Sequence, residues 1–540
     1  MSRFDIDANL GQALRKSKWS IDSYRAAVAT YRNAQNKEEK RKMQTLIRDI
    51  KSDFRSEISS NDPKVKRLKK LSGQLLQMTT QGQLFEKSKK EKAAWKKKVK
   101  TLTKKTEKLE AEIEEIKANK IYENAFEWRF EFPEVLNAEG DFVGFDVVIG
   151  NPPYAVLEKK RNTKLEPYRD ILEYSNENNR YAHVSGGKQN LYRLFLKLAY
   201  DLAKIKGSFG FIIPLTFIGD NSLHKTRMFV LNNFTFLRLH CFPQKDIPSR
   251  RVFEDAKQST LVILGNINKP RSNDKGQLFK VYTYPYNSFL DEHKVYEASI
   301  SEIEKFDPHR NSIPIVSEKE WRILQKIHNA PAIRSISEIK VNRGEINQTI
   351  YREYISTDSE LSTLVKGVEV GKYVININLS QGFREFFDEK AYEDNGKKNK
   401  LKGKRRIATQ RITGVDEKLR IVAMIFEPPA YFADSTNSIY TEGKFSLEYI
   451  LGLFNSKLFQ WRFKKTSSNN NVSTTELESL PFNFESENGA KITNLVTKVI
   501  SLKKQDPSAD TSALEAEIDG LVYDLYGLTD EEVGVVEGAG

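Results

Sequence analysis

A short apolar run that ends at two prolines constrains the fold of this chain more than any other feature. Residues 145–149 read FDVVI, and Gly150, Asn151, Pro152 and Pro153 follow directly. Proline lacks the N–H group that a strand ladder needs, so a strand over this run must stop before Pro152. Because the run is almost continuously apolar and rich in β-branched residues, it predicts a buried strand of a parallel sheet.

Helix and strand patterns alternate after this point. A helix is predicted to begin at Leu191 and to end near Gly207, because its apolar residues recur at three- and four-residue spacing. Further strands are predicted over residues 209–213, 237–242 and 259–264. This alternation is typical of a doubly wound α/β sheet, which we place in residues 121–268.

The first 120 residues have a different composition, rich in lysine and glutamate, with a helical repeat. One a/d seam consists of Val99, Leu102, Thr106, Leu109, Ile113 and Ile116. A second seam, after a helix start at Pro63, consists of Val65, Leu68, Leu75 and Met78. We therefore predict a coiled-coil-like helical arm over residues 1–120, folded as an antiparallel hairpin. Its lysines, among them Lys96, Lys97 and Lys98, either face solvent or contact phosphate.

Three more segments complete the expected organisation. Residues 269–325 contain turn residues and scattered aromatics without a clear repeat, so we expect a connector there. Residues 326–482 predict a mixed α+β domain. Residues 483–540 predict helices, with Thr529 and Glu532 spaced as a capping box.

Charge and composition restrict the partners. A net charge of +14 favours a polyanion, because each lysine or arginine that contacts a phosphate releases counterions from nucleic acid. With one cysteine and six histidines, neither a disulfide framework nor a metal site is expected. No apolar run reaches the ~20 residues of a membrane-spanning helix, and no signal-peptide pattern opens the sequence. We expect a cytoplasmic protein without a membrane partner.

The residues after the predicted strand suit the chemistry of an aromatic amine. Ligands of open α/β sheets gather at the carboxyl ends of strands, where Asn151, Pro152, Pro153 and Tyr154 stand. The exocyclic amine of adenine is a poor nucleophile because its lone pair is delocalised into the ring. The Asn151 side-chain oxygen and the Pro152 carbonyl could each accept one amine hydrogen and free that lone pair. Tyr154 offers a ring on which a flipped base could stack. The alternative interpretation is an ordinary turn that ends a strand.

Residues 145–154 resemble motif IV of the gamma-class N6-adenine DNA methyltransferases, above all the fused type IIG restriction-modification enzymes. Residues 126–135 resemble the segment before the catalytic strand in that family, and residues 190–214 resemble its motifs V and VI. The resemblance implies part of a Rossmann-like methyltransferase domain. Phe253, in a stretch similar to motif VIII, is implied to pack on the flipped adenine opposite Tyr154. The alternatives are that Phe253 is an ordinary core residue, or that Phe242 takes this place.

The same resemblance implies S-adenosylmethionine as the methyl donor, but its glycine-rich loop is missing from the sequence. No such loop follows a predicted strand. Glu131 and Phe132 resemble part of motif III and are the candidate cofactor contacts. We therefore expect a partner chain, or a missing N-terminal region, to bind most of the cofactor. Such a partner could also carry a nuclease.

Residues 326–482 are similar to the target-recognition domains of these enzymes, which implies binding of double-stranded DNA. The matching pieces lie at residues 342–346, 364–367, 405–407, 449–457 and 480–482. Contacts to DNA phosphates are expected from a basic run, namely Lys397, Lys398, Lys400, Lys402, Lys404, Arg405 and Arg406. The expected activity is site-specific adenine methylation in restriction-modification or phage defence. A non-catalytic DNA-specificity subunit is the first alternative, and a nuclease subunit is the second.

Overall fold

The computed structural model describes most of the chain, in two compact units. The described residues are 20–58, 63–82, 89–117, 128, 132–138, 141–157, 171–172, 175–176, 179–187, 189–268, 275–379, 382–413, 419–443, 445–466 and 470–538. Unit 1 consists of Met1–Phe211 and Gly265–Arg271, and unit 2 consists of Ile212–Leu264 and Ser272–Gly540. The five-part division predicted from the sequence remains a prediction. No helix in these described ranges is long and apolar enough to span a bilayer.

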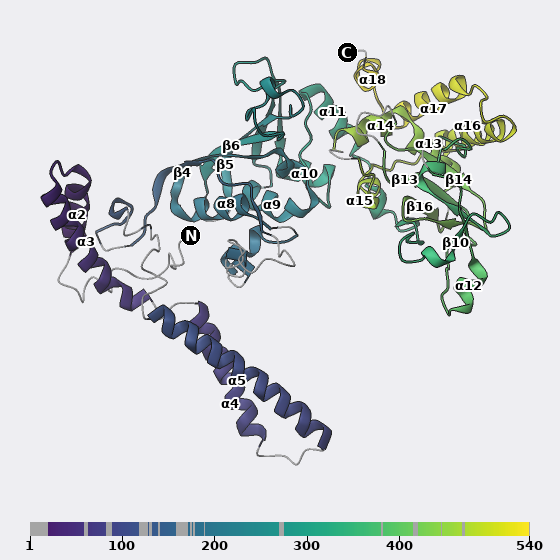
Figure 1. Cartoon of the computed structure of the whole chain (residues 1–540). Helices are drawn as coiled ribbons and strands as arrows, with labels where there is room; N and C mark the ends of the chain where they lie inside the picture. The colour runs from purple at the N-terminus through teal and green to yellow at the C-terminus, as the bar shows by residue number, and fades with distance from the viewer. Residues whose placement is uncertain are drawn as a thin grey trace. The chain divides into compact units, whose positions relative to one another are not determined.

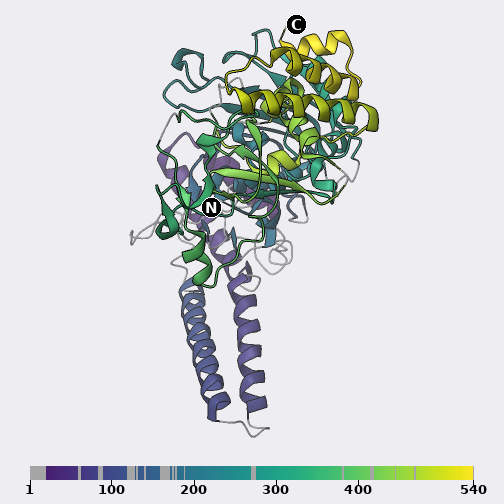
Figure 2. The same cartoon turned by 90° about the vertical axis from the view of Figure 1, so that its right-hand side faces the viewer.

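Unit 1 begins with a helical arm. Its helices are α2 (Ile21–Asn33), α3 (Lys37–Ile58), α4 (Pro63–Gly82) and α5 (Lys89–Lys117). Helices α4 and α5 lie side by side as an antiparallel hairpin in both views (Figures 1 and 2). Thr106 and Ile113 of the predicted seam are buried, and the Trp95 indole donates to the Met78 carbonyl across the pair at 3.3 Å. The hairpin and the helix start at Pro63 are therefore confirmed.

Strand β1 (Phe145–Gly150) confirms the predicted strand but not its burial. It pairs in parallel with β4 (Ala203–Pro214), in a register that places Gly150 opposite Phe211. Val147 is 59% exposed and Ile149 is 82% exposed. The prediction of a buried strand is wrong: among the described residues β1 is the first strand in the sheet order, β1-β4-β6-β5-β7-β8, and the side chains of Val147 and Ile149 are left largely uncovered.

Helix α8 (Leu191–Leu202) lies between β1 and β4 in the sequence. It ends at Leu202 rather than near Gly207, and β4 follows at once. Gly207 belongs to β4, where a Cβ atom would lie 3.0 Å from the Phe145 carbonyl oxygen. This glycine therefore allows a close approach of two strands and does not cap a helix. A two-residue pair, β2 (Val156–Leu157) with β3 (Gln189–Asn190), precedes α8.

The next elements of the sheet confirm two predicted strands and add two that the sequence did not predict. The confirmed strands are β5 (Phe234–Phe242) and β6 (Thr260–Ile267), and α9 (His224–Asn233) precedes β5. The segment expected to be a connector contains β7 (Leu278–Thr283), β8 (Lys294–Ser299), α10 (Ile300–Phe306) and α11 (Glu318–Ile327). Strand β7 pairs in parallel with β5, and its alternate side chains Phe279 and Val281 are buried.

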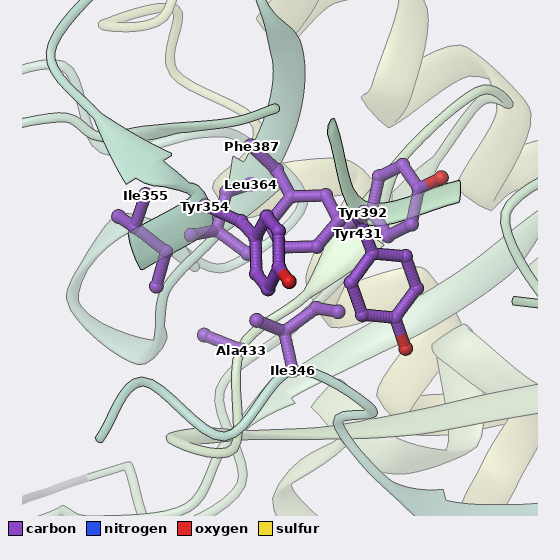
Figure 3. Packing of buried hydrophobic residues seen from close by; sticks show 8 residues of the cluster. All are labelled: Ile346, Tyr354, Ile355, Leu364, Phe387, Tyr392, Tyr431 and Ala433. Atoms are coloured by element: carbon purple, nitrogen blue, oxygen red, sulfur yellow. The ribbon is translucent and has the colours of Figure 1, made fainter. Parts of the chain in front are cut away.

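Two small sheets follow in unit 2. The first has the order β10-β12-β11-β15 and consists of β10 (Ile355–Ser356), β12 (Phe386–Phe387), β11 (Ser362–Val365) and β15 (Tyr431–Phe432). The second has the order β14-β13-β16-β9 and consists of β14 (Ala423–Phe426), β13 (Arg406–Gln410), β16 (Thr436–Thr441) and β9 (Ile339–Arg343). Aromatic side chains pack on the first sheet, with Phe387 and Tyr431 ring centres 4.5 Å apart (Figure 3). The mixed α+β prediction for residues 326–482 is confirmed.

Helices complete unit 2. They are α12 (Glu389–Asp394), α13 (Leu447–Asn455), α14 (Lys457–Lys464), α15 (Thr474–Glu478), α16 (Ser486–Gln505), α17 (Ser512–Leu525) and α18 (Asp530–Glu537). The predicted capping box is present at α18, where the Thr529 hydroxyl and the Glu532 carboxylate satisfy each other's backbone N–H groups.

Candidate active site

The Asn-Pro-Pro-Tyr loop leaves β1 at its carboxyl end. Asn151 and Pro153 are exposed, Pro152 is buried and Tyr154 is half-buried. Among the described residues, nothing hydrogen-bonds the Asn151 side chain. The backbone of Asn151 is held between the end of β1 and the buried Pro152, while its side chain is exposed to solvent. The loop can therefore present an oxygen acceptor to a ligand.

Asn190 holds the far end of this loop. Its side-chain amide donates to the Tyr154 carbonyl at 2.9 Å, while its side-chain oxygen accepts the Tyr192 N–H and caps α8. The Leu191 N–H donates to the Ala155 carbonyl at 2.9 Å. The sequence placed Asn190 within a family-like stretch without giving it a role. Its N-cap position was the available signal, but its second bond depends on tertiary structure.

Burial keeps the Tyr154 hydroxyl neutral. Loss of hydration raises the pKa of Tyr154 to about 12, because the phenolate form would be poorly solvated. Its ring meets the edge of Tyr192, with ring centres 6.4 Å apart. A neutral ring with a fixed neighbour has a defined orientation, as a stacking platform for a base requires.

The structure distinguishes the two phenylalanines considered for the opposite side of the base. Phe242 is buried and stacks on Tyr284 at 4.9 Å, so it is a core residue. Phe253 is half-buried in the loop between β5 and β6. It belongs to unit 2, whereas Tyr154 belongs to unit 1. Pairing of Phe253 and Tyr154 around a base therefore stays a prediction.

Of the two candidate cofactor contacts, Glu131 and Phe132, the structure describes only Phe132. Glu131 lies outside the described residues. Phe132 stacks on Trp128 at 5.8 Å, meets the edge of Phe145 at 5.4 Å and has the Arg32 guanidinium 5.3 Å from its ring centre. The ring is thus already occupied by packing within unit 1. A cofactor role for Glu131 and Phe132 stays untested.

The basic run expected to contact phosphates is largely paired with acidic groups of the same unit. Lys402 binds Glu389 and Glu393, Lys404 binds Glu442, and Arg405 binds Glu427 and Glu448. Arg406 is 1% exposed and makes two 3.0 Å bonds to Glu345.

The other members of the run differ in their contacts. Lys397 donates to the Tyr354 hydroxyl at 3.1 Å. Lys398 and Lys400 make no ion pair with any described residue. Contact of the seven side chains with DNA remains a prediction.

Two parts of the chain match known families, namely the part that contains the exposed Asn-Pro-Pro-Tyr loop and the later α+β domain. Residues 4–247 match the Eco57I restriction-modification methylase family. Residues 362–482 match the TaqI-like C-terminal specificity domain. Two segments of the chain are therefore similar to restriction-modification methylases and to the specificity domain of TaqI-like enzymes.

Known proteins of the same kind are similar to this chain. A candidate type II restriction enzyme and methyltransferase of Methanocaldococcus jannaschii is 26% identical over 160 residues, which is 30% of this chain and 11% of that relative. The type IIL restriction-modification enzyme MmeI, solved with DNA, is 12% identical with a TM-score of 0.42, over 78% of this chain and 62% of MmeI. The type IIG endonuclease BpuSI is 12% identical with a TM-score of 0.28, over 71% of this chain and 54% of BpuSI. The chain thus spans only part of each.

Proposed function

We propose that this chain holds the target adenine for N6 methylation of double-stranded DNA, with S-adenosylmethionine as the methyl donor. The observation that carries the proposal is the Asn151 side chain, exposed at the carboxyl end of β1 with no hydrogen-bond partner among the described residues. The match to a restriction-modification methylase family supports methyl transfer to DNA. The choice of adenine N6 rests on the resemblance of residues 145–154 to motif IV of the N6-adenine methyltransferases.

In this proposal the loop makes the amine of adenine nucleophilic. The Asn151 side-chain oxygen and the Pro152 carbonyl accept the two amine hydrogens, which draws the nitrogen toward tetrahedral geometry. The two prolines hold these acceptors with little freedom left to lose. The neutral Tyr154 ring carries the base after it has left the duplex, which offsets the lost stacking by ~1–3 kcal/mol.

The methyl donor is proposed to bind mainly outside the described residues. Phe132 is packed by its neighbours, and the sequence has no glycine-rich loop after a strand. We therefore assign the cofactor site to a partner chain or to a region attached to this one. The chain then supplies the base pocket and the specificity domain.

Substitution at Asn151 tests the proposal in cells that express the chain together with its neighbouring open reading frames. N6-methyladenine in total DNA is measured by mass spectrometry of nucleosides. Asn151→Ala is expected to lower adenine methylation at least ~100-fold, by analogy with removal of one polar group that stabilises a transition state. Asn151→Asp keeps an acceptor oxygen and is expected to retain part of the activity.

A matched control is Asn395→Ala, since Asn395 is also exposed but lies after α12. It is expected to leave methylation unchanged. Unchanged methylation in Asn151→Ala would overturn the catalytic role and leave the non-catalytic specificity subunit as the better account. Methylated cytosine in place of methylated adenine would overturn the choice of base.

A further inference from the structure

A large cavity in unit 2 is lined by segments that come from distant parts of the sequence. Its volume is about 970 Å³. Leu215 lines it just after the carboxyl end of β4, and Pro243 lines it just after the carboxyl end of β5. Arg411 and Lys464 line it from the segment that matches the specificity domain. The carboxyl ends of strands are where α/β sheets bind their ligands.

The lining of this cavity is strongly basic. Of its 23 residues, six are lysine or arginine and two are acidic, which predicts an anionic occupant. Two of the six cations are already neutralised, because Arg310 pairs with Asp307 at 3.0 Å and Lys465 pairs with Glu320. The remaining four are Lys245, Lys257, Arg411 and Lys464.

Few acidic side chains of the described residues neutralise the charges of these four cations. Lys245 and Lys464 make no ion pair there, and Lys257 has only an exposed contact with Asp246 at 3.2 Å. Arg411 donates to a backbone carbonyl, that of Asp434, and its Nε atom is buried without an acceptor. A buried donor without an acceptor is unfavourable and gains most from an incoming anion.

The pKa values of Arg411 and Lys464 are shifted in the opposite direction from that of Lys402 in the basic run at residues 397–406. Burial lowers the pKa of Arg411, and the nearby Arg343 lowers it further, while the charge of Asp434 raises it in part. Burial likewise lowers the pKa of Lys464, with added repulsion from Arg420 and Lys465. By contrast, hydrogen bonds to Glu389 and Glu393 raise the pKa of Lys402. The cavity therefore has unbalanced positive charge, whereas the run is largely balanced.

We propose that this cavity is the phosphate-contact groove for double-stranded DNA, with Lys257, Arg411 and Lys464 binding phosphates of the backbone. The proposal rests on the proposed function and deepens it by locating the contacts that position the substrate. Cations on separate segments suit a row of phosphates along a nucleic-acid backbone better than they suit one small anion. Side chains of this type fix the register of a protein on a duplex without reading its sequence.

The test measures binding of the full chain to a dye-labelled duplex of arbitrary sequence, by fluorescence anisotropy at several salt concentrations. The triple variant Lys257→Gln, Arg411→Gln and Lys464→Gln is expected to bind at least ~10-fold more weakly at low salt. Each lost phosphate contact should also reduce the slope of log affinity against log salt by about 0.9. The single variant Lys464→Gln removes one exposed charge and should reduce the slope by about that amount, with unchanged thermal unfolding.

The matched control removes three exposed charges of α16 that do not line the cavity, through Lys491→Gln, Lys498→Gln and Lys504→Gln. It is expected to keep the wild-type slope. Equal losses in both triple variants, or a loss only in the control, would overturn the assignment of the groove. Tighter binding of single-stranded RNA than of the duplex would overturn the choice of ligand. DNA binding is measured in the groove variants and adenine methylation in Asn151→Ala, so failure of the groove and failure of the methylation chemistry are distinguishable.

Discussion

At the scale of single residues, Asn190 performs two tasks with the two ends of one amide. The oxygen caps α8, and the nitrogen holds the carbonyl of Tyr154. These tasks can be separated because aspartate is as good an N-cap as asparagine but has no N–H to donate. The candidate catalytic loop is thus anchored by a residue that lies outside the loop.

The free energy of unfolding of Asn190→Asp is expected to lie within about 0.5 kcal/mol of the wild-type value. Adenine methylation is expected to be ~10-fold slower, because only the contact with the loop is lost. Asn190→Ala loses the cap as well and should be less stable by about 1 kcal/mol. Thermal unfolding and nucleoside mass spectrometry measure the two effects. Wild-type methylation in Asn190→Asp would show that the loop needs no anchor.

Glu345 is the second residue whose role follows from its contacts. It accepts two bonds from Arg406, which is fully buried with its guanidinium 4.0 Å from the centre of the Phe432 ring. Glu345→Ala is expected to cost about 3–5 kcal/mol, because it leaves a buried cation without its partner. Lys404→Gln, at an exposed pair with Glu442, should cost at most about 1 kcal/mol. Urea denaturation compares the two, and equal costs would contradict a structural role for Arg406.

At the scale of elements, β1 combines a fixed register with one uncovered face. Ile149→Thr is expected to change the free energy of unfolding by at most about 0.5 kcal/mol, because the side chain is already exposed. Leu196→Ala in α8 removes a fully buried side chain and should cost about 2–5 kcal/mol. Urea denaturation checks both values. A large cost for Ile149→Thr would mean that another surface covers β1.

The sequence predicted elements better than it predicted their surroundings. The apolar run of β1 and the alternation in β4, β5 and β6 were sufficient to locate these strands. Burial of β1 was mispredicted because exposure depends on which strand lies beside it, and no local pattern encodes that. Strand β7 was missed although LFKVYT alternates, because the flanking turn residues suggested a connector. Gly207 was misassigned because a glycine suits both a helix cap and a close strand contact.

At the scale of the whole molecule, a buried ionic network joins segments of unit 2 that are far apart in sequence. Asp307 binds Arg310 and Ser312, Arg310 lies 3.6 Å from Glu476, and Arg462 donates to His328 at 2.6 Å. Burial alone would raise the pKa of Asp307, but Arg310, Ser312 and Arg462 outweigh it, and the pKa is lowered from 3.8. Its contribution to stability is therefore present above about pH 4 and is lost as pH falls through the lowered pKa.

Asp307→Asn tests this network. The variant is expected to be about 1.5–3 kcal/mol less stable at neutral pH, because charge-assisted hydrogen bonds are lost. It should also lose less stability than wild type when the pH drops below about 4, since its amide does not titrate there. Urea midpoints over a pH series measure both effects. Parallel curves for the two proteins would contradict the role given to the Asp307 carboxylate.

The candidate site was only partly accessible from the sequence at this scale. The loop from Asn151 to Tyr154 was located because its residue types and its position after a strand are both local features. The groove of Lys257, Arg411 and Lys464 was not, because its cations lie far apart in the chain and only the fold brings them to one cavity. The run at 397–406 was predicted to contact phosphates because it is a dense cluster of basic residues. Most of its charges have acidic neighbours in the fold.

Among the described residues, β1 is the edge strand of its sheet, and this has a consequence for self-association of the protein. Backbone groups along an edge strand can pair with an extended peptide. The exposed side chains of Val147 and Ile149 favour such pairing. Two copies that meet through β1 would block the approach to the Asn151 loop that follows it. Self-association through β1 and loss of methylation would then occur together.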